Sequence, residues 1–405
     1  MLGDFKPVYL DTAKCNGCVG CMRSCPTEAI RVRNGKAAIM YERCIGCGEC
    51  VRHCPTHAKK EFYDNLDSIN AYKYKVAVPS PSIYGQFNNI HDTNLVLTAI
   101  KRLGFDDVVE GAVGAEYVSA ATAEYIKNND INGPVISSSC PAVVNLILMR
   151  YDGWKDNLSP LQQPEEVAAN IALAKAQMET GLSADEIGVF VITQCAANVM
   201  SLKNSKSAKI SGVLSSKELY FPLLNKLNSI KEGEVEKLAM AGSLGVSWGA
   251  SSGEARGLKT DNYLHVDGIE NVLRALNDLE HDRLNGIDFL ELYACNLGCV
   301  GGSMNVESPF LASTRLRKLR NSMKEKGVSV TDYSAYLRRQ PYQSNNVFRL
   351  DDDRMEAMKK AMKARQICES LPGINCGGCG APSCAALAED LVRGVVAKCR
   401  YQKED

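Results

Sequence analysis

Two runs of cysteine near the start of the chain constrain its fold more than any other feature. Each run has the spacing C-x2-C-x2-C-x3-C-P, and together they contain Cys15, Cys18, Cys21, Cys25, Cys44, Cys47, Cys50 and Cys54. The chain has 405 residues and 17 cysteines, which gather in tight groups, whereas a secreted disulfide scaffold is short and begins with a signal peptide. No apolar signal segment follows Met1. The pattern therefore indicates metal or cluster ligation by thiolates.

The doubled spacing resembles that of bacterial ferredoxins with two [4Fe–4S] clusters, in which the fourth cysteine of each run ligates the other cluster. We therefore assign one cluster to Cys15, Cys18, Cys21 and Cys54, and the second to Cys44, Cys47, Cys50 and Cys25. Zinc and disulfides are the alternatives, and the proline after each fourth cysteine argues against both. A ferredoxin-like α+β domain is expected over residues 1–60. It would move electrons, but by itself it names no reaction.

Charge and hydropathy exclude several classes of partner. Lys plus Arg and Asp plus Glu both number 47, so no net field favours nucleic acid or an anionic membrane surface. The longest apolar stretch, residues 137–149, is too short to cross a bilayer. We expect a cytoplasmic protein that binds neither nucleic acid nor membrane.

The middle of the chain alternates between strand-like and helix-like segments. We expect a linker helix over 61–73 and then an α/β domain over 74–350 with mostly parallel strands. The expected strands are 74–79, 107–110, 133–137, 187–193, 209–214 and 287–291. The expected helices are 94–103, 116–127, 164–180, 216–227, 268–279 and 310–326. Ligands of such a domain lie at the carboxyl ends of its strands.

Three of these strand ends carry cysteine. Cys140 follows the strand over 133–137, Cys195 follows 187–193, and Cys295 and Cys299 follow 287–291 in a Gly-rich turn. A single buried cysteine is often only a small apolar side chain. Four of them behind a ferredoxin-type segment favour one shared cluster instead.

These segments resemble the three signature motifs of [FeFe]-hydrogenases. They are Ser137-Ser138-Ser139-Cys140-Pro141, Thr193-Gln194-Cys195-Ala196-Ala197-Asn198, and the stretch from Glu291 to Gly302. The resemblance spans roughly residues 1–350 and implies a two-lobed α/β domain that holds an H-cluster. It implies a [4Fe–4S] cubane on Cys140, Cys195, Cys295 and Cys299. By position, Cys299 would bridge to a di-iron centre with CO, cyanide and a bridging dithiolate amine.

Several positions depart from the family pattern. Ser139 stands where the family has its proton-transferring cysteine, and Asn198 where a lysine would bond a cyanide ligand. Thr193 and Tyr293 replace methionines that pack on the di-iron centre, and residues 120–123 lack the glutamates of the family's proton pathway. The departures resemble the slow, sensory type of the superfamily (group C/D-like).

Ser139 and Glu254 are the candidate proton relays, with Asn198 as a candidate for bonding to the cofactor. The resemblance places the loop that contains Glu254 near the cofactor. The alternative is a surface glutamate paired with Arg256.

The C-terminal segment is expected to hold a further cluster. Residues 351–367 are expected to form a linker helix with an apolar methionine stripe, and residues 368–405 a small helical domain. The domain resembles the [4Fe–4S] domains of RnfB-type electron carriers and corrinoid iron–sulfur proteins, with ligands Cys376, Cys379, Cys384 and Cys399. The stretch from Cys384 to Cys399 is expected to be one helix. Zinc is the alternative metal, and Cys368 is expected to pack rather than ligate.

The hypothesis is an [FeFe]-hydrogenase-like protein of low turnover that interconverts H2 with protons. Its redox partner would be a ferredoxin or a signalling protein, and its oligomeric state is left open, a homodimer included. Two alternatives remain. The central cysteines would hold only a plain [4Fe–4S] cluster, or the chain would be an electron-transfer subunit of a larger complex.

Overall fold

The computed structural model describes residues 5–231, 233–258, 260–395, 397–399 and 401. It separates into two compact units. The small unit contains residues 1–62, 145–152 and 343–405, and the large unit contains 63–144 and 153–342. The limits expected for the ferredoxin-like, central and C-terminal domains stay predictions.

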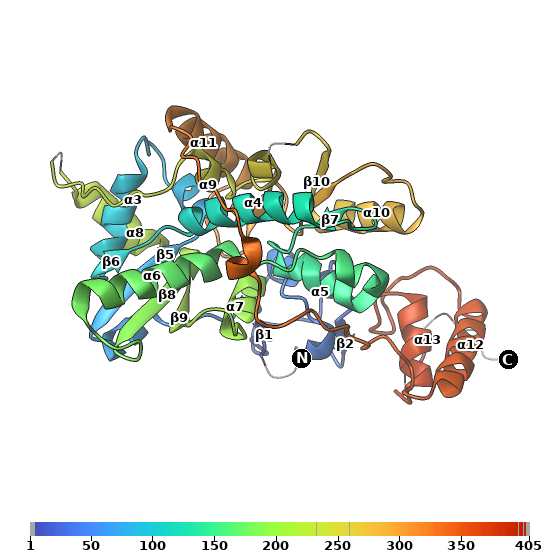
Figure 1. The fold of residues 1–405 in the computed structure, drawn as a ribbon. Helices are drawn as coiled ribbons and strands as arrows, with labels where there is room; N and C mark the ends of the chain where they lie inside the picture. The colour runs from blue at the N-terminus through green and yellow to red at the C-terminus, as the bar shows by residue number, and fades with distance from the viewer. Residues whose placement is uncertain (1–4, 232, 259, 396, 400, 402–405) are drawn as a thin grey trace. The chain divides into compact units, whose positions relative to one another are not determined.

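A four-stranded parallel sheet forms the first layer of the large unit (Figure 1). Its strands follow the order β6 (Asp107–Val108), β5 (Tyr74–Pro79), β8 (Ile187–Thr193) and β9 (Gly212–Ser215). All seven residues of β8 are buried, as in a parallel strand that is covered on both faces. The parallel α/β core predicted from the sequence is confirmed.

Helices cover both faces of this sheet. Helices α3 (Thr93–Lys101) and α8 (Ser216–Ser229) share an apolar cluster with Phe190 and Ile192 of β8. Helix α6 (Pro164–Thr180) contacts β5 and β8, and it also packs along α4 (Gly111–Asn128). The remaining helices of the α/β region are α5 (Pro141–Arg150), α7 (Ala196–Lys203), α9 (Ser243–Ser247), α10 (Ile269–Glu280) and α11 (Pro309–Ser322).

A second sheet of three parallel strands completes the large unit. Its order is β10 (Tyr263–Asp267), β11 (Phe289–Tyr293) and β7 (Val135–Ile136), with β11 buried throughout. Strand β10 was not expected, because its residues are only partly buried or exposed and show no clear apolar run.

The small unit begins with two antiparallel strand pairs. Strand β1 (Val8–Leu10) pairs with β4 (Lys59–Glu61), and β2 (Ile30–Arg33) pairs with β3 (Lys36–Ile39). The short helices α1 (Gly20–Arg23) and α2 (Glu49–Arg52) each lie inside one cysteine run. The 3-10 segments of the chain are Tyr41–Arg43, Leu66–Ala71, Pro81–Gln86, Asp152–Asn157, Ala255–Leu258, Gly298–Gly301 and Tyr333–Tyr336.

The expected linker helix over 61–73 is wrong. Strand β4 extends to Glu61, and only Leu66–Ala71 is helical, in the 3-10 form. The Asn65 side chain accepts from the Asp67 N–H, and Ser68 donates to the Asn65 carbonyl. Such local bonds compete with the regular α-helical pattern.

Helices α12 (Arg354–Ser370) and α13 (Cys384–Val392) pack against each other in the C-terminal segment. The expectation of one helix from Cys384 to Cys399 is wrong, because α13 ends at Val392. Gly394 has a φ of 84°, and its N–H bonds to the Leu391 carbonyl while the Val395 N–H bonds to that of Asp390. This pair of bonds is the Schellman arrangement that ends many helices.

A buried ion-pair cluster joins α13 to strand β2 within the small unit. Arg31 donates from Nε and Nη2 to the two carboxylate oxygens of Asp390, at 2.8 and 3.0 Å, and Arg33 adds a bond of 2.6 Å. Arg43 pairs with the neighbouring Glu389. Arg31 and Asp390 are each only 5% exposed, so each depends on the other for its charge balance.

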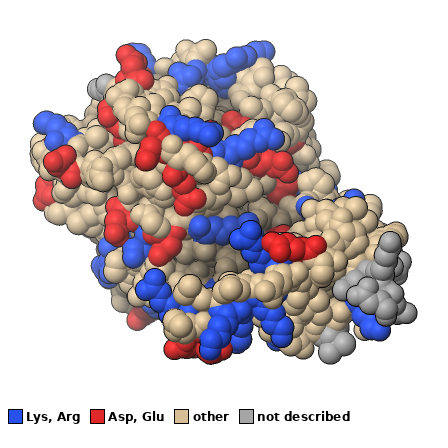
Figure 2. Space-filling view, turned by 90° about the vertical axis from the view of Figure 1, so that its right-hand side faces the viewer, with Lys and Arg blue, Asp and Glu red and all other residues tan. Residues whose placement is uncertain are grey.

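In the part of the chain that the structure describes, no helix is both long enough and apolar enough to span a bilayer. On the face drawn in Figure 2, basic and acidic side chains are intermixed, and neither sign forms a continuous sector there.

Replacing Asp390 should strongly destabilise the small unit. Asp390→Ala leaves the Arg31 guanidinium buried without its partner, which we expect to cost roughly 3–5 kcal/mol in the free energy of unfolding. Denaturant titration, with hydrogen exchange of α13 as a local readout, measures this cost. Glu369→Ala removes an exposed pair with Arg365 and should cost about 0–1 kcal/mol. Equal effects of the two substitutions would contradict the structural importance of the cluster.

Candidate functional site

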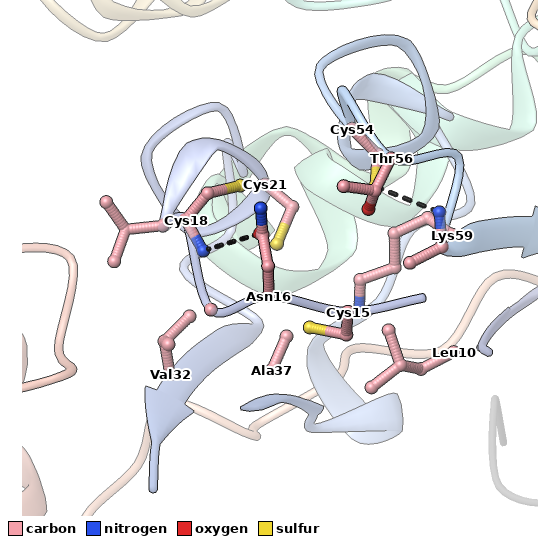
Figure 3. A pocket seen from close by; sticks show the side chains of 13 residues that line it. Leu10, Cys15, Asn16, Cys18, Cys21, Val32, Ala37, Cys54, Thr56 and Lys59 are labelled. Carbon is pink, nitrogen blue, oxygen red and sulfur yellow. Dashed lines mark hydrogen bonds between the residues drawn. The ribbon is translucent and has the colours of Figure 1, made fainter. Parts of the chain in front are cut away.

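Two cavities of the small unit are lined by the cysteines of the ferredoxin-type runs. The first is lined by Cys15, Cys18, Cys21 and Cys54, and the second by Cys25, Cys44, Cys47 and Cys50. Figure 3 shows the first cavity, with three thiols from one run and Cys54 from the other. The structure thus brings together the two sets that were assigned from the sequence.

The two runs build the same local geometry twice. The Cys25 thiol accepts from the Ala29 N–H, and the Cys54 thiol accepts from the Ala58 N–H, both at 3.2 Å. A backbone N–H aimed at a sulfur stabilises the thiolate form, which is the form that ligates iron. The repeat therefore suits two similar clusters.

The candidate ligands of the C-terminal segment lie around one apolar cluster. Cys384 belongs to this cluster, and Cys379 and Cys399 pack against it. The Gly378 N–H points at the Cys376 thiol at 3.5 Å. Cys368, on α12, packs on the same cluster, and the expectation that it does not ligate stays a prediction.

The loop that carries Cys376 contacts the first ferredoxin-type run. Arg23, at the end of α1, donates to the Cys376 carbonyl at 2.7 Å. A side chain built at Gly377 would meet the Met22 side chain at 3.0 Å, so the loop lies directly against α1. Cys21 also lies on α1, so the loop that carries Cys376 contacts the same helix that carries a ligand of the first N-terminal set.

The four central cysteines follow the carboxyl ends of β7, β8 and β11. Burial raises the pKa of Cys299 well above its ordinary value, and the neighbouring Cys195, Cys140 and Cys295 raise it further. Burial likewise raises the pKa of Cys140 to about 11, with Cys295 as the next cause. The four thiols are therefore close enough to interact, although they come from three separate segments.

Direct contacts hold two of these segments together. The Met304 N–H donates to the Gln194 carbonyl at 2.9 Å, next to Cys195. A Cβ at Gly302 would lie 2.4 Å from the same oxygen, so only glycine permits this approach.

Ser139 and Glu254, expected near the cofactor, are in direct contact. Ser139 donates to Glu254 Oε2 at 2.6 Å, and Ser137 bonds to the same oxygen. Glu254 is 1% exposed, so the alternative of a surface glutamate is wrong. Arg256 instead donates from Nε to Ser252. Burial raises the pKa of Glu254 to about 7, against the opposing effect of the two serine hydrogen bonds.

A second buried carboxyl group, Glu291, was missed by the sequence reasoning. It lies in the middle of β11, where burial and then the neighbouring Glu254 raise its pKa to about 8. Its Oε2 accepts from the Ala255 N–H at 2.8 Å, and its Oε1 has no partner among the described residues. A single glutamate inside an otherwise apolar strand was the available signal. Glu254 and Glu291 are therefore both poised to exchange protons near neutral pH.

Asn198 is buried, and both hydrogens of its amide are engaged. Nδ2 donates to Thr193 at 3.1 Å and to Glu165 at 3.3 Å, which leaves Oδ1 as its free atom. The hydroxyl of Tyr293 is also buried without a described partner. These two polar atoms without partners suit a site that receives a cofactor able to form hydrogen bonds. The free atom of Asn198 is an acceptor, so this amide could donate to such a cofactor only after a 180° rotation that exchanges Oδ1 and Nδ2.

The described residues do not have the geometry of a site for a single metal ion. No three His, Cys, Asp or Glu side chains of the described residues lie within reach of one metal ion. A cubane, by contrast, spreads its four thiolates over four separate irons.

Comparisons with known families and structures agree with these sites. Residues 73–253 match the family model of the iron only hydrogenase large subunit, C-terminal domain. Residues 7–55 match the family model of a 4Fe-4S dicluster domain, and residues 371–401 match a family model whose description is an Fe-S cluster. The segment with Cys295 and Cys299 lies beyond these ranges.

Solved [FeFe]-hydrogenases share the fold. A variant of HydA1 from Chlamydomonas reinhardtii aligns with a TM-score of 0.54 and 13% identity, over 70% of this chain and 98% of that one. A structure from work on oxygen inactivation of the H cluster gives a TM-score of 0.52 and 14% identity over the same shares. An apo variant of the same algal enzyme gives 0.53. At such identity these matches establish the fold.

The stability of the protein should depend on pH through Glu254. Between pH about 4.5 and about 7, folded Glu254 keeps a proton that the unfolded chain has already released. The contribution of Glu254 to the free energy of unfolding therefore falls as pH rises through this window, and Glu291, with its pKa raised to about 8, continues the fall to about pH 8. Glu254→Gln should flatten this slope in denaturant titrations at a series of pH values.

Glu280→Gln, at an exposed position of α10, is the matched control and should keep the wild-type slope. A Glu254→Gln variant with the full wild-type slope would show that Glu254 titrates in the folded protein as in the unfolded chain.

Proposed function

We propose that the chain is an [FeFe]-hydrogenase-family protein with an N-terminal ferredoxin-like domain, and that its central domain binds an H-cluster and interconverts H2 with protons and electrons at low turnover. The observation that carries the proposal is the gathering of Cys140, Cys195, Cys295 and Cys299 behind three parallel strands. The slow rate and a sensory, cytoplasmic role belong to the proposal.

The residues present fit such a cofactor. The four thiols would hold its cubane, with Cys299 as the bridge to the di-iron centre. When bound, the H-cluster supplies the heterolytic cleavage of H2 and the base at which it occurs. The chain supplies placement, exclusion of water and a route for protons.

Ser139, Glu254 and Glu291 form the proposed proton route. A serine hydroxyl ionises too weakly to be an acid alone, but it relays a proton when a hydrogen-bonded carboxyl group accepts it. Glu254 accepts a hydrogen bond from Ser139, and burial raises its pKa to about 7, so it can gain or lose a proton near neutral pH. Glu291 has a carboxylate oxygen without a described partner, and its pKa is raised to about 8. Its other oxygen accepts from the N–H of Ala255, the residue after Glu254, which supports proton exchange between the two carboxyl groups. This route would take the place of the family's cysteine.

Electrons would pass through the N-terminal clusters and leave through the C-terminal one. The contact of the Cys376 loop with α1 supports direct exchange between the C-terminal cluster and the cluster of Cys21. The outer partner would be a ferredoxin or a signalling protein.

A plain [4Fe–4S] cluster in the central domain is the second candidate function. The free atom of Asn198 is an acceptor rather than a donor, and Tyr293 presents a hydroxyl where the family has a methionine. In this case, or as an electron-transfer subunit of a larger complex, the protein would carry electrons without acting on H2.

Replacing Cys195 should remove one cubane and the di-iron centre together. We expect Cys195→Ala to lose about a third of the iron, because one of four proposed [4Fe–4S] clusters disappears together with the two irons of the di-iron centre. Iron analysis and electron paramagnetic resonance of the reduced protein measure this. Cys368→Ala is the matched control, because Cys368 packs on α12 outside every proposed ligand set, and it should keep all clusters. Full iron content in Cys195→Ala would remove Cys195 from the ligand set.

Glu254→Gln should slow the exchange of H2 with solvent deuterium roughly a hundredfold, the usual size of a general acid–base contribution. Glutamine keeps the size and hydrogen bonding of the side chain but cannot release a proton. Glu280→Gln should leave the exchange rate unchanged. An unchanged rate in Glu254→Gln, with the cofactor loaded to the wild-type level, would rule out Glu254 as the relay.

A further inference from the structure

A buried lysine lines the first cavity of the small unit. Lys59 is 3% exposed, and its ammonium group has no hydrogen-bond partner among the described residues. Burying a charge without compensation is strongly unfavourable, so an unpartnered ammonium indicates that a negative group belongs beside it.

The backbone fixes where this ammonium points. Lys59 is the first residue of β4 and pairs with Leu10 of β1. Its side chain extends from the strand toward Cys15 (Figure 3) and lines the cavity with Cys15, Cys18, Cys21 and Cys54. The strand register therefore directs the charge at the proposed first cluster.

The other lysine of this strand pair, Lys60, is different: its side chain is 43% exposed and lies 3.5 Å from Asp11. Lys59 is therefore the lysine of the strand pair that lines the first cavity.

Reduction of a [4Fe–4S] cluster adds one negative charge to a group that is already anionic. A buried cation beside it stabilises the reduced form more than the oxidised form, which raises the reduction potential. Net charge and hydrogen bonds at the sulfurs are known to set cluster potentials.

We propose that Lys59 tunes the first N-terminal cluster, because its ammonium lies in the cavity that the ligands of this cluster line and there favours the reduced form. The inference rests on the cluster assignment of the proposed function but not on H2 chemistry. A ferredoxin domain tuned in this way would accept electrons more readily and hold them for its partner.

The test compares Lys59→Met with the wild-type full-length protein, reconstituted with [4Fe–4S] clusters only. Both are titrated anaerobically with a reductant, and the reduced clusters are measured by electron paramagnetic resonance. At one solution potential, the ratio of reduced to oxidised first N-terminal cluster should fall at least tenfold in Lys59→Met, which is about 59 mV for a one-electron couple.

Three further variants complete the test. Lys59→Gln keeps a polar side chain without charge and should shift the ratio in the same direction, so the test stands even if Lys59→Met fails to assemble its clusters. Lys59→Arg keeps the charge, and Lys60→Met removes a neighbouring exposed charge; both should stay within threefold of wild type. Iron and sulfide analysis confirms equal loading.

Unchanged ratios in both uncharged variants would overturn the proposal, and so would a shift confined to the second cluster. Failure of the cluster assignment looks different: wild-type protein would then show no signal from reduced N-terminal clusters at any potential.

Discussion

The structure depends on the parallel pairing of buried strands, which places their carboxyl ends on common edges. Strands β8 and β11 are buried along their whole length and belong to different sheets, yet each is followed after one residue by a cysteine. Parallel pairing brings together the ends of β7 and β11, which share a sheet, whereas the segment after β8 is joined to the third motif by the bond from the Met304 N–H to the Gln194 carbonyl. Glycine at position 302 then lets the third motif come within hydrogen-bond distance of the segment with Cys195.

Buried charges mark the functional parts of both units. Glu254 and Glu291 lie in the interior of the large unit, where burial moves their pKa values to about 7 and about 8. Lys59 is buried beside the first set of thiols, and its ammonium has no hydrogen-bond partner among the described residues. Asp390, in contrast, is satisfied by two arginines and serves to hold α13 on β2. The ion pairs of Asp390 therefore hold two elements of the small unit together. The buried groups without an ion-pair partner, in contrast, are the ones that we assign to proton or electron transfer.

Sequence reasoning found the parts of the site whose chemistry is local. Cysteine spacing predicts which thiols share a loop, and the structure lines each N-terminal cavity with the expected set. It also found Ser139 and Glu254 but not their direct bond, which joins residues far apart in the chain. Glu291 and Lys59 were missed, because burial of a charged side chain is decided by tertiary packing. The end of α13 was missed despite a local signal, since Gly394 forms the left-handed cap that ends many helices.

The central claim is that the four cysteines of the large unit hold more than a cubane. The most direct measurement is the infrared spectrum of the wild-type protein after reconstitution of its [4Fe–4S] clusters and supply of a synthetic di-iron cofactor. The account predicts bands from bound CO and cyanide that change when H2 is added. A protein with all four cubanes assembled but without such bands would contradict it and would leave an electron carrier built on a hydrogenase fold.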